Sequence, residues 1–265
     1  RKVIASEGLV APVDMEVGPD NALYVINFGP TADMGQVVRI PLPSMTTSIA
    51  AAKDNTLYEN ETGALSNGAG DHFFAGVTAD GNGNLIRRGV LAFDVNSALP
   101  EGAIVVSATL DLNMSRTITE DKAVALHLLE KDWGEGDSDA EGQEGAGATA
   151  MSGDATWLHT FYDTTSWDTP GGDFEVQESA STMVGGIGQY AWSSPQMATD
   201  VQAWLDDADS NYGWLLKGDE SGGASAKRFD SRENSDPANQ PKLTVEYIVP
   251  LPQAITYLPG ILTSE

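Results

Sequence analysis

Short alternations of apolar and polar residues, broken by Gly, Asn and Asp, run from about residue 50 to residue 248. This period of two is typical of half-buried antiparallel strands. The clearest cases have apolar side chains at alternate positions from Ile104 to Met114 and from Leu243 to Val249. The stretches HFFAGV, RGVLAFDV, GWLLKG and AKRFDSRE predict further strands. The pattern therefore predicts an all-β fold.

One segment, SSPQMATDVQAWLDD (193–207), has a helical period instead. Ser194 is placed to cap the helix and Pro195 to occupy its first position. Met197, Val201, Trp204 and Leu205 fall on one stripe. Because about three turns are not stable alone in water, we expect this helix to pack on a sheet, with Trp204 in the core. Trp133 and Trp214 lie in similar contexts and are expected in the core as well.

The first 46 residues have a different pattern. VDMEVGPDNALYVINFG predicts a hairpin turning at 18–21, and GQVVRI predicts a third strand. The segment resembles one blade of a β-propeller of the NHL or sugar-dehydrogenase kind. A single blade cannot bury its own faces, so we expect this segment to dock on the main domain or to pair with another chain.

Pro41-Leu42-Pro43 and Pro250-Leu251-Pro252 punctuate the chain, because proline stiffens a linker and ends strand pairing. They predict three parts: an N-terminal β-hairpin extension (1–46), a main domain (47–248) and an apolar C-terminal tail (249–265). Because the tail is apolar, we expect it to lie against another surface. One candidate partner is a second copy of this chain, bound through the terminal strands.

The main domain is similar to the DNRLRE domain, which is close to disaggregatase-related and family-96 carbohydrate-binding modules. The resemblance is carried by KDNTLYENETGALSNGAGDHFFAG, PEGAIVVSATLDLNM, the helix with NYGWLLKGDE, and most specifically FDSRE (229–233) and PKLTVEY. It implies an antiparallel jelly-roll β-sandwich with one short helix and β-strand extensions at both termini. It also implies a secreted or cell-surface protein that binds a polysaccharide. The insertion from Gly134 to Phe174 exceeds the family pattern.

Composition restricts the chemistry further. The 265 residues hold 39 Asp and Glu against 14 Lys and Arg, a formal charge of −25, and no cysteine. Thiolate catalysis, disulfides and zinc ribbons are excluded, and so large a negative charge repels nucleic acid. No apolar run reaches the roughly 18 residues of a membrane span. We expect no nucleic-acid partner, no membrane insertion, and an extracellular or cell-surface location.

The stretch KDWGEGDSDAEGQEG (131–145) is the most acidic in the chain. Its glycine spacing does not give the rigid carboxylate pair that a glycosidase needs, so a catalytic role is not expected. Two interpretations stay open: a solvated loop, or a flexible Ca²⁺ loop. The candidate calcium ligands are Asp132, Glu135, Asp137 and Asp139.

Aromatic and basic residues supply the candidate sugar site, because sugar C–H faces stack on aromatic rings while charged groups bind hydroxyls. The candidates are Trp157, Tyr162 and Trp167 in the insertion, together with Arg232. The alternative is that these rings pack the insertion onto the sandwich.

The few basic residues are clustered along two strands. Arg87 and Arg88 on one, and Lys227, Arg228 and Arg232 on another, form a strip that could hold a carboxylate sugar if the strands are neighbours. Pairs of Arg88 with Asp94, and of Arg232 with Glu233 or Asp230, are the structural alternative.

The sequence carries no H-E-x-x-H, G-x-S-x-G or Walker A motif. We therefore expect a non-catalytic module for carbohydrate recognition or surface attachment. One alternative is a structural subunit of a surface filament or layer that assembles by strand donation. Another is an accessory module of a larger propeller sugar dehydrogenase.

Overall fold

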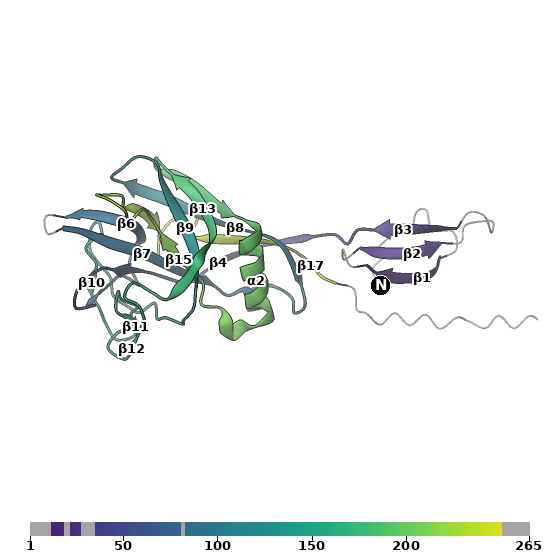
Figure 1. Ribbon diagram of the computed structural model, residues 1–265, viewed down its shortest axis with the longest axis horizontal. Helices are drawn as coiled ribbons and strands as arrows, with labels where there is room; N and C mark the ends of the chain where they lie inside the picture. Colours follow the sequence, from purple (N-terminus) through teal and green to yellow (C-terminus); the bar gives the residue numbers. More distant parts are fainter. Residues whose placement is uncertain (1–11, 19–21, 28–34, 81–82, 251–265) are drawn as a thin grey trace, which may run out of the picture.

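The protein folds mainly as β-strands in a sandwich, with a small separate sheet at its N-terminal end (Figure 1). The computed structural model describes residues 12–18, 22–27, 35–80 and 83–250. The all-β prediction is confirmed at this level. Its principal strands are β4 (Met45–Tyr58), β6 (His72–Asp80), β7 (Gly83–Phe93), β8 (Ile104–Thr117), β9 (Lys122–Leu129), β13 (Phe174–Val184), β14 (Gly188–Ser193), β15 (Trp214–Lys217), β16 (Lys227–Asp230) and β17 (Lys242–Ile248).

Two sheets form the sandwich. In the first sheet, β8 pairs with β14 along one edge and with β17 and β16, one after the other, along its other edge. The first half of β4 then pairs with β17, and the first half of β6 pairs with β16. We call this the β8 sheet. The β9 sheet runs β13, β9, β15, β7, and then the second halves of β4 and β6. Both β4 and β6 thus cross from one sheet to the other and close one side of the sandwich.

The crossing of β6 is made at Gly76. Its φ of +108° lies in the left-handed region that favours glycine, and a Cβ there would lie 2.9 Å from the carbonyl oxygen of Ser225. β4 turns at Ala51–Lys53, where its register with β7 shifts. These two bends place the first half of β6 next to β16, which is where the candidate site forms.

The core lies between the sheets and is capped by α2 (Pro195–Asp206). Ser194 caps this helix by accepting a hydrogen bond from the backbone of Met197, and Pro195 occupies the first turn, as predicted. Trp204 and Trp214 are buried with ring centroids 4.5 Å apart. The predicted helix and its core tryptophan are confirmed. The remaining helical pieces are α1 (Val95–Ala98) and η1 (Ala208–Ser210).

Two expected inward positions are wrong, because Val249, which follows β17, is 38% exposed and Val106 is exposed as well. Val106 was expected to share the buried face of β8 but is 46% exposed. The register of β17 with β8 moves from Glu246 opposite Ser107 to Tyr247 opposite Val105, so Val106 has no cross-strand partner. This bulge reverses the alternation near the start of β8, whereas Leu110 and Met114 further along are buried as predicted.

The N-terminal strands form their own sheet in the order β1 (Pro12–Val17), β2 (Leu23–Asn27) and β3 (Gln36–Ile40). The three strands lie where the sequence predicted them, and Figure 1 shows them apart from the sandwich. Strand pairing with another chain stays a prediction, and nearly all of the apolar tail, 251–265, lies outside the described residues. Within the described part of the chain, no helix is long and apolar enough to cross a membrane.

The insertion between β9 and β13 covers part of the outer face of the β9 sheet. Its short strands are β10 (Ala148–Thr149), which pairs with β5 (Leu65–Ser66), and β11 (His159–Phe161), which pairs with β12 (Thr165–Ser166). A second apolar cluster holds the insertion on the sheet: Leu57, Val90, Ala92, Leu129, Trp133, Ala155, Trp157, Trp167 and Leu215. Trp133 is buried, as expected, although in this second cluster.

Candidate functional site

A row of three side chains crosses β6, β16 and β8. The register sets Arg228 opposite Phe74 on one side and opposite Arg116 on the other. All three side chains therefore lie on the outer face of the β8 sheet. Two guanidinium groups directly opposite each other on neighbouring strands repel, so this arrangement lowers stability unless an anion compensates it.

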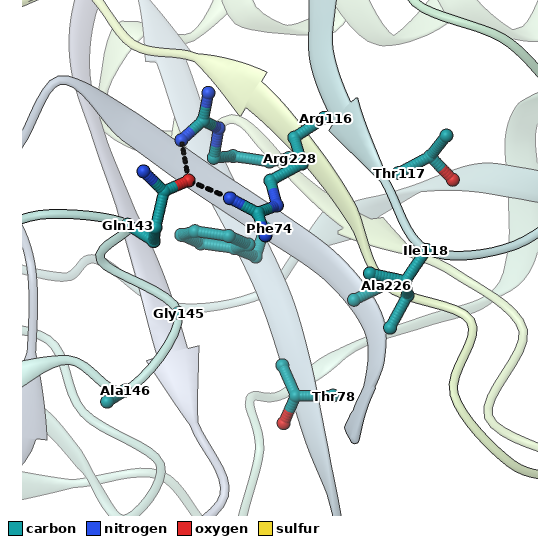
Figure 2. A pocket seen from close by; sticks show the side chains of 10 residues that line it. All are labelled: Phe74, Thr78, Arg116, Thr117, Ile118, Gln143, Gly145, Ala146, Ala226 and Arg228. Carbon is teal, nitrogen blue, oxygen red and sulfur yellow. Dashed lines mark hydrogen bonds between the residues drawn. The ribbon is translucent and has the colours of Figure 1, made fainter. Parts of the chain in front are cut away.

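The row borders a surface pocket of about 220 Å³, shown in Figure 2. Strands supply Phe74 and Thr78 from β6, Arg228 from β16, and Arg116 with Thr117 from β8, while Ala226 lies just before β16. The acidic stretch supplies its other wall with Gln143, Gly145 and Ala146. Arg116, Arg228, Thr78 and Gln143 give it polar groups, and Phe74 gives it an aromatic floor. Below, these residues are termed the arginine pocket.

The two pocket arginines lack acidic partners, although the chain has 39 carboxylates. Neither forms an ion pair with a carboxylate of the described residues, whereas Lys53, Arg88, Lys122, Lys131 and Arg232 all do. Arg228 donates instead to the hydroxyl of Ser115 at 3.1 Å. Burial lowers the pKa of Arg228; the charges of Asp230 and Glu144 oppose this shift, and the neighbouring Arg116 adds to it. The pocket is thus a cationic position in an anionic protein.

The loop wall of the pocket is fixed at Glu144, a buried residue with φ of +62°. Its carboxylate accepts hydrogen bonds from the side chain of Asn67 and the backbone of His72, both at 2.9 Å, and lies 3.0 Å from Nδ1 of His72. Its carbonyl accepts from Tyr58 at 2.9 Å. Burial alone would raise the pKa of Glu144, but the hydrogen bonds from His72 and Asn67 hold it below its ordinary value.

The predicted aromatic residues lie elsewhere, on the outer face of the β9 sheet. Trp157 and Trp167 are 8% and 5% exposed and belong to the second apolar cluster. The indole of Trp167 donates to the carbonyl of Thr156 at 2.9 Å, and Arg88 lies over the ring of Trp157 at 5.0 Å. Tyr162 is half-buried against His159. The two tryptophans pack the insertion, which is the alternative that the sequence left open, and present no open ring face for a sugar.

The predicted calcium ligands do not converge. Asp132 pairs with Lys53 at 2.7 Å, Glu135 pairs with Arg232 at 2.6 Å, and Asp137 and Asp139 are exposed. Among the described residues, no three or more His, Asp or Glu side chains are grouped to hold a metal ion. This geometry gives Ca²⁺ no ligand set, and calcium binding stays a prediction.

Arg232 lies in a group of carboxylates, not in the pocket. Its guanidinium contacts both oxygens of Glu135, at 2.6 and 2.9 Å, and Glu233 at 2.9 Å. Its backbone donates to the buried carboxylate of Asp54 at 2.8 Å. The predicted pair of Arg232 with Glu233 is confirmed. Arg88, in contrast, pairs with Glu220 and not with Asp94, which caps α1.

The Arg232 group makes stability depend on pH through Glu233. Burial, opposed by Arg232 but assisted by Glu135, raises the pKa of Glu233 from 4.5 to about 7. Because the folded pKa is the higher one, its stabilisation is complete below about pH 4.5 and is lost as the pH rises through 7. We expect unfolding free energy to fall by about 1–2 kcal/mol from this group between pH 5 and 8, allowing for solvent screening.

Urea unfolding at pH 5, 6, 7 and 8, followed by tryptophan fluorescence, measures this dependence. Glu233→Gln keeps the shape and removes the titration, so the fall with pH should be shallower by the stated amount. Glu233 also raises the pKa of the neighbouring Asp54, so its removal makes the fall with pH shallower through that group too, whereas the net charge of −25 acts almost equally on both proteins. Parallel stability curves for the two proteins would contradict the assignment.

Fold and pocket together define a β-sandwich protein with a cationic pocket on one sheet face. No family model matches the chain, and no curated protein matches it. The resemblance to the DNRLRE domain therefore stays a prediction that rests on the residues quoted for it. Of the pocket residues, the sequence singled out Arg228 alone; Arg116, Gln143 and Phe74 were missed.

Proposed function

We propose that this chain is a non-catalytic module that recognises carbohydrate at the cell surface or outside the cell, and that the arginine pocket is its binding site. The proposed ligand is a sugar residue that carries a carboxylate, as in a polyuronate. One observation carries the proposal: Arg116 and Arg228 lie opposite each other without a carboxylate partner among the described residues of a chain whose net charge is −25. A jelly-roll strand order and a surface location belong to the same proposal.

The chemistry of the pocket suits such a sugar. Guanidinium groups bind planar carboxylates through paired, charge-assisted hydrogen bonds. Thr78 offers a hydroxyl, and Phe74, which is 5% exposed, offers a small apolar contact and not an open ring face. A volume of about 220 Å³ is below the 300–1,000 Å³ usual for larger ligands, so the pocket takes one sugar residue and leaves its neighbours outside.

Because the protein as a whole is negatively charged, the arginines can attract an anionic ligand only over a short distance. At an ionic strength near 0.15 M, charges farther than about 8 Å away are largely screened, whereas contacts inside the pocket are not. The arginines therefore act on a carboxylate at short range, while the rest of the surface repels a polyanion weakly. Binding should be measured at this ionic strength.

We expect Arg228→Ala to weaken binding to a polyuronate such as alginate or polygalacturonate by about 10- to 100-fold, the value of one or two charge-assisted hydrogen bonds. Titration calorimetry and affinity electrophoresis measure the loss. Lys242→Ala is the matched control, because it removes one positive charge from β17 outside the pocket. Arg116→Ala should behave like Arg228→Ala.

Two results would contradict the proposal. One is the absence of any retention of uronate oligomers or polymers by the unchanged protein at 0.15 M salt. The other is an Arg228→Ala protein that binds as tightly as the Lys242→Ala protein. Circular dichroism and the urea midpoint test for misfolding. Because Arg228→Ala removes one of two repelling charges, the spectrum should stay the same and the midpoint should not fall.

A further inference from the structure

Gln143 lies in the loop wall of the arginine pocket, beside the two guanidinium groups. Its amide oxygen accepts hydrogen bonds from Arg116 and, at 3.1 Å, from Arg228, as Figure 2 shows. One oxygen thus receives an N–H from each guanidinium. A carboxylate oxygen of a bound ligand would receive the same two donors.

An amide oxygen is a weak substitute for an anion. It carries no net charge, so its hydrogen bonds to the arginines are weaker than those of a carboxylate, and it adds nothing to the distant charges of Asp230 and Glu144 that oppose the repulsion between the two guanidinium groups. The side chain of Gln143 is exposed, and within the described residues these two are its hydrogen bonds. Little holds it in place other than the arginines themselves.

The backbone beside Gln143 is held firmly, in contrast. The next residue, Glu144, is buried and hydrogen-bonded to Asn67, His72 and Tyr58. The carbonyl of Gly145 accepts from Arg87 at 3.1 Å. The side chain of Gln143 can therefore rotate out of the pocket while its backbone stays in the wall.

We propose that Gln143 is a built-in competitor for the arginine pocket. Its amide oxygen holds the position of the anionic group while the pocket is empty, and an incoming carboxylate displaces it. This inference rests on the proposed function and adds a regulatory element to the same site. The competition lowers the affinity for every ligand and discriminates against neutral sugars, which cannot offer the arginines more than the amide does.

Two substitutions at this position test the competitor in opposite directions. Gln143→Ala should raise the affinity for a uronate oligomer about 3- to 10-fold, because nothing has to be displaced. Gln143→Glu should lower it at least 10-fold, because a carboxylate of the chain then pairs with both arginines. Gln177→Glu, which adds one charge on β13 away from the pocket, is the control for the added charge.

Inorganic sulfate provides a measurement that does not depend on the sugar. Sulfate raises the melting temperature of folded proteins in general. At matched ionic strength, replacing chloride by sulfate should therefore raise that of Gln143→Ala more, and that of Gln143→Glu less, than that of the unchanged protein. Equal sulfate responses in the three proteins would overturn the inference.

The two proposals fail in different ways. If Arg228→Ala loses polyuronate binding while both Gln143 variants bind like the unchanged protein, the binding function stands and the competitor is refuted. If no variant binds a polyuronate, the proposed ligand is refuted, and the sulfate response alone decides whether Gln143 competes for the arginines.

Discussion

Replacing Arg232 with methionine is expected to lower the free energy of unfolding by about 2–4 kcal/mol. The guanidinium is shared by Glu135 and Glu233, and its backbone amide binds the carboxylate of Asp54. Asp54 is 1% exposed and the other two side chains are 18% and 22% exposed, so none can recover full hydration when the cation is lost. The side chain of Arg232 is 39% exposed, so solvent screening sets the lower end of the range. Urea unfolding at pH 7.5 measures the effect.

A double-mutant cycle with Glu135→Gln separates the ion pair from other effects of the substitution. Glu135→Gln removes one of the carboxylates that the methionine leaves unpaired, so Arg232→Met should cost less in that background. Arg232→Lys, which keeps the charge but not the paired hydrogen bonds, should give a smaller loss. A stable Arg232→Met protein that has lost polyuronate binding would instead restore the sugar-binding role that the sequence suggested for Arg232.

The sandwich could be predicted from the sequence because burial of one sheet face imposes a period of two, and α2 because its apolar stripe has a helical period. These are local properties of the chain. Val106 shows where they fail: a bulge is a relation between two strands, here β8 and β17, and neither strand's own alternation records it.

The arginine pocket could not be predicted for the same reason. Arg116 follows Met114 at a spacing of two, so strict alternation would place both on the buried face. The register of β16 with β8 shifts between Arg228 and Phe229, which sets Arg116 opposite Arg228 while Met114 lies opposite Phe229. The pocket thus depends on the alignment of strands that are distant in the chain, and on a loop whose course is fixed by Glu144.

The acidic stretch shows a different limit of sequence analysis. Its composition fitted a calcium loop, yet its carboxylates are drawn apart, Asp132 to Lys53, Glu135 to Arg232 and Glu144 to His72. With few cations in the chain, each one attracts acids from separate segments. Composition therefore indicated the charge of this stretch but not the partner of any single carboxylate.

Among the lysines of the described residues, Lys227 stands apart because it is fully buried and forms no ion pair with a carboxylate there. Its ammonium shares its three N–H groups among four oxygens: the hydroxyl of Thr117 at 2.8 Å and the carbonyls of Thr119 at 3.2 Å, Glu120 at 2.8 Å and Gly185 at 3.3 Å. Burial lowers its pKa. The side chain joins the turn after β8 to the turn between β13 and β14, beside the arginine pocket.

Lys227→Met is therefore expected to destabilise the fold by about 2–4 kcal/mol, because methionine fills the space of the stem but leaves buried oxygens without a donor. Lys122→Met is the matched control: this lysine is 37% exposed and pairs with Asp219, so its loss should cost at most about 1 kcal/mol. Urea unfolding of both variants makes the comparison. If the two lose equal stability, the four oxygens around Lys227 are satisfied by water, and the turns do not depend on its ammonium.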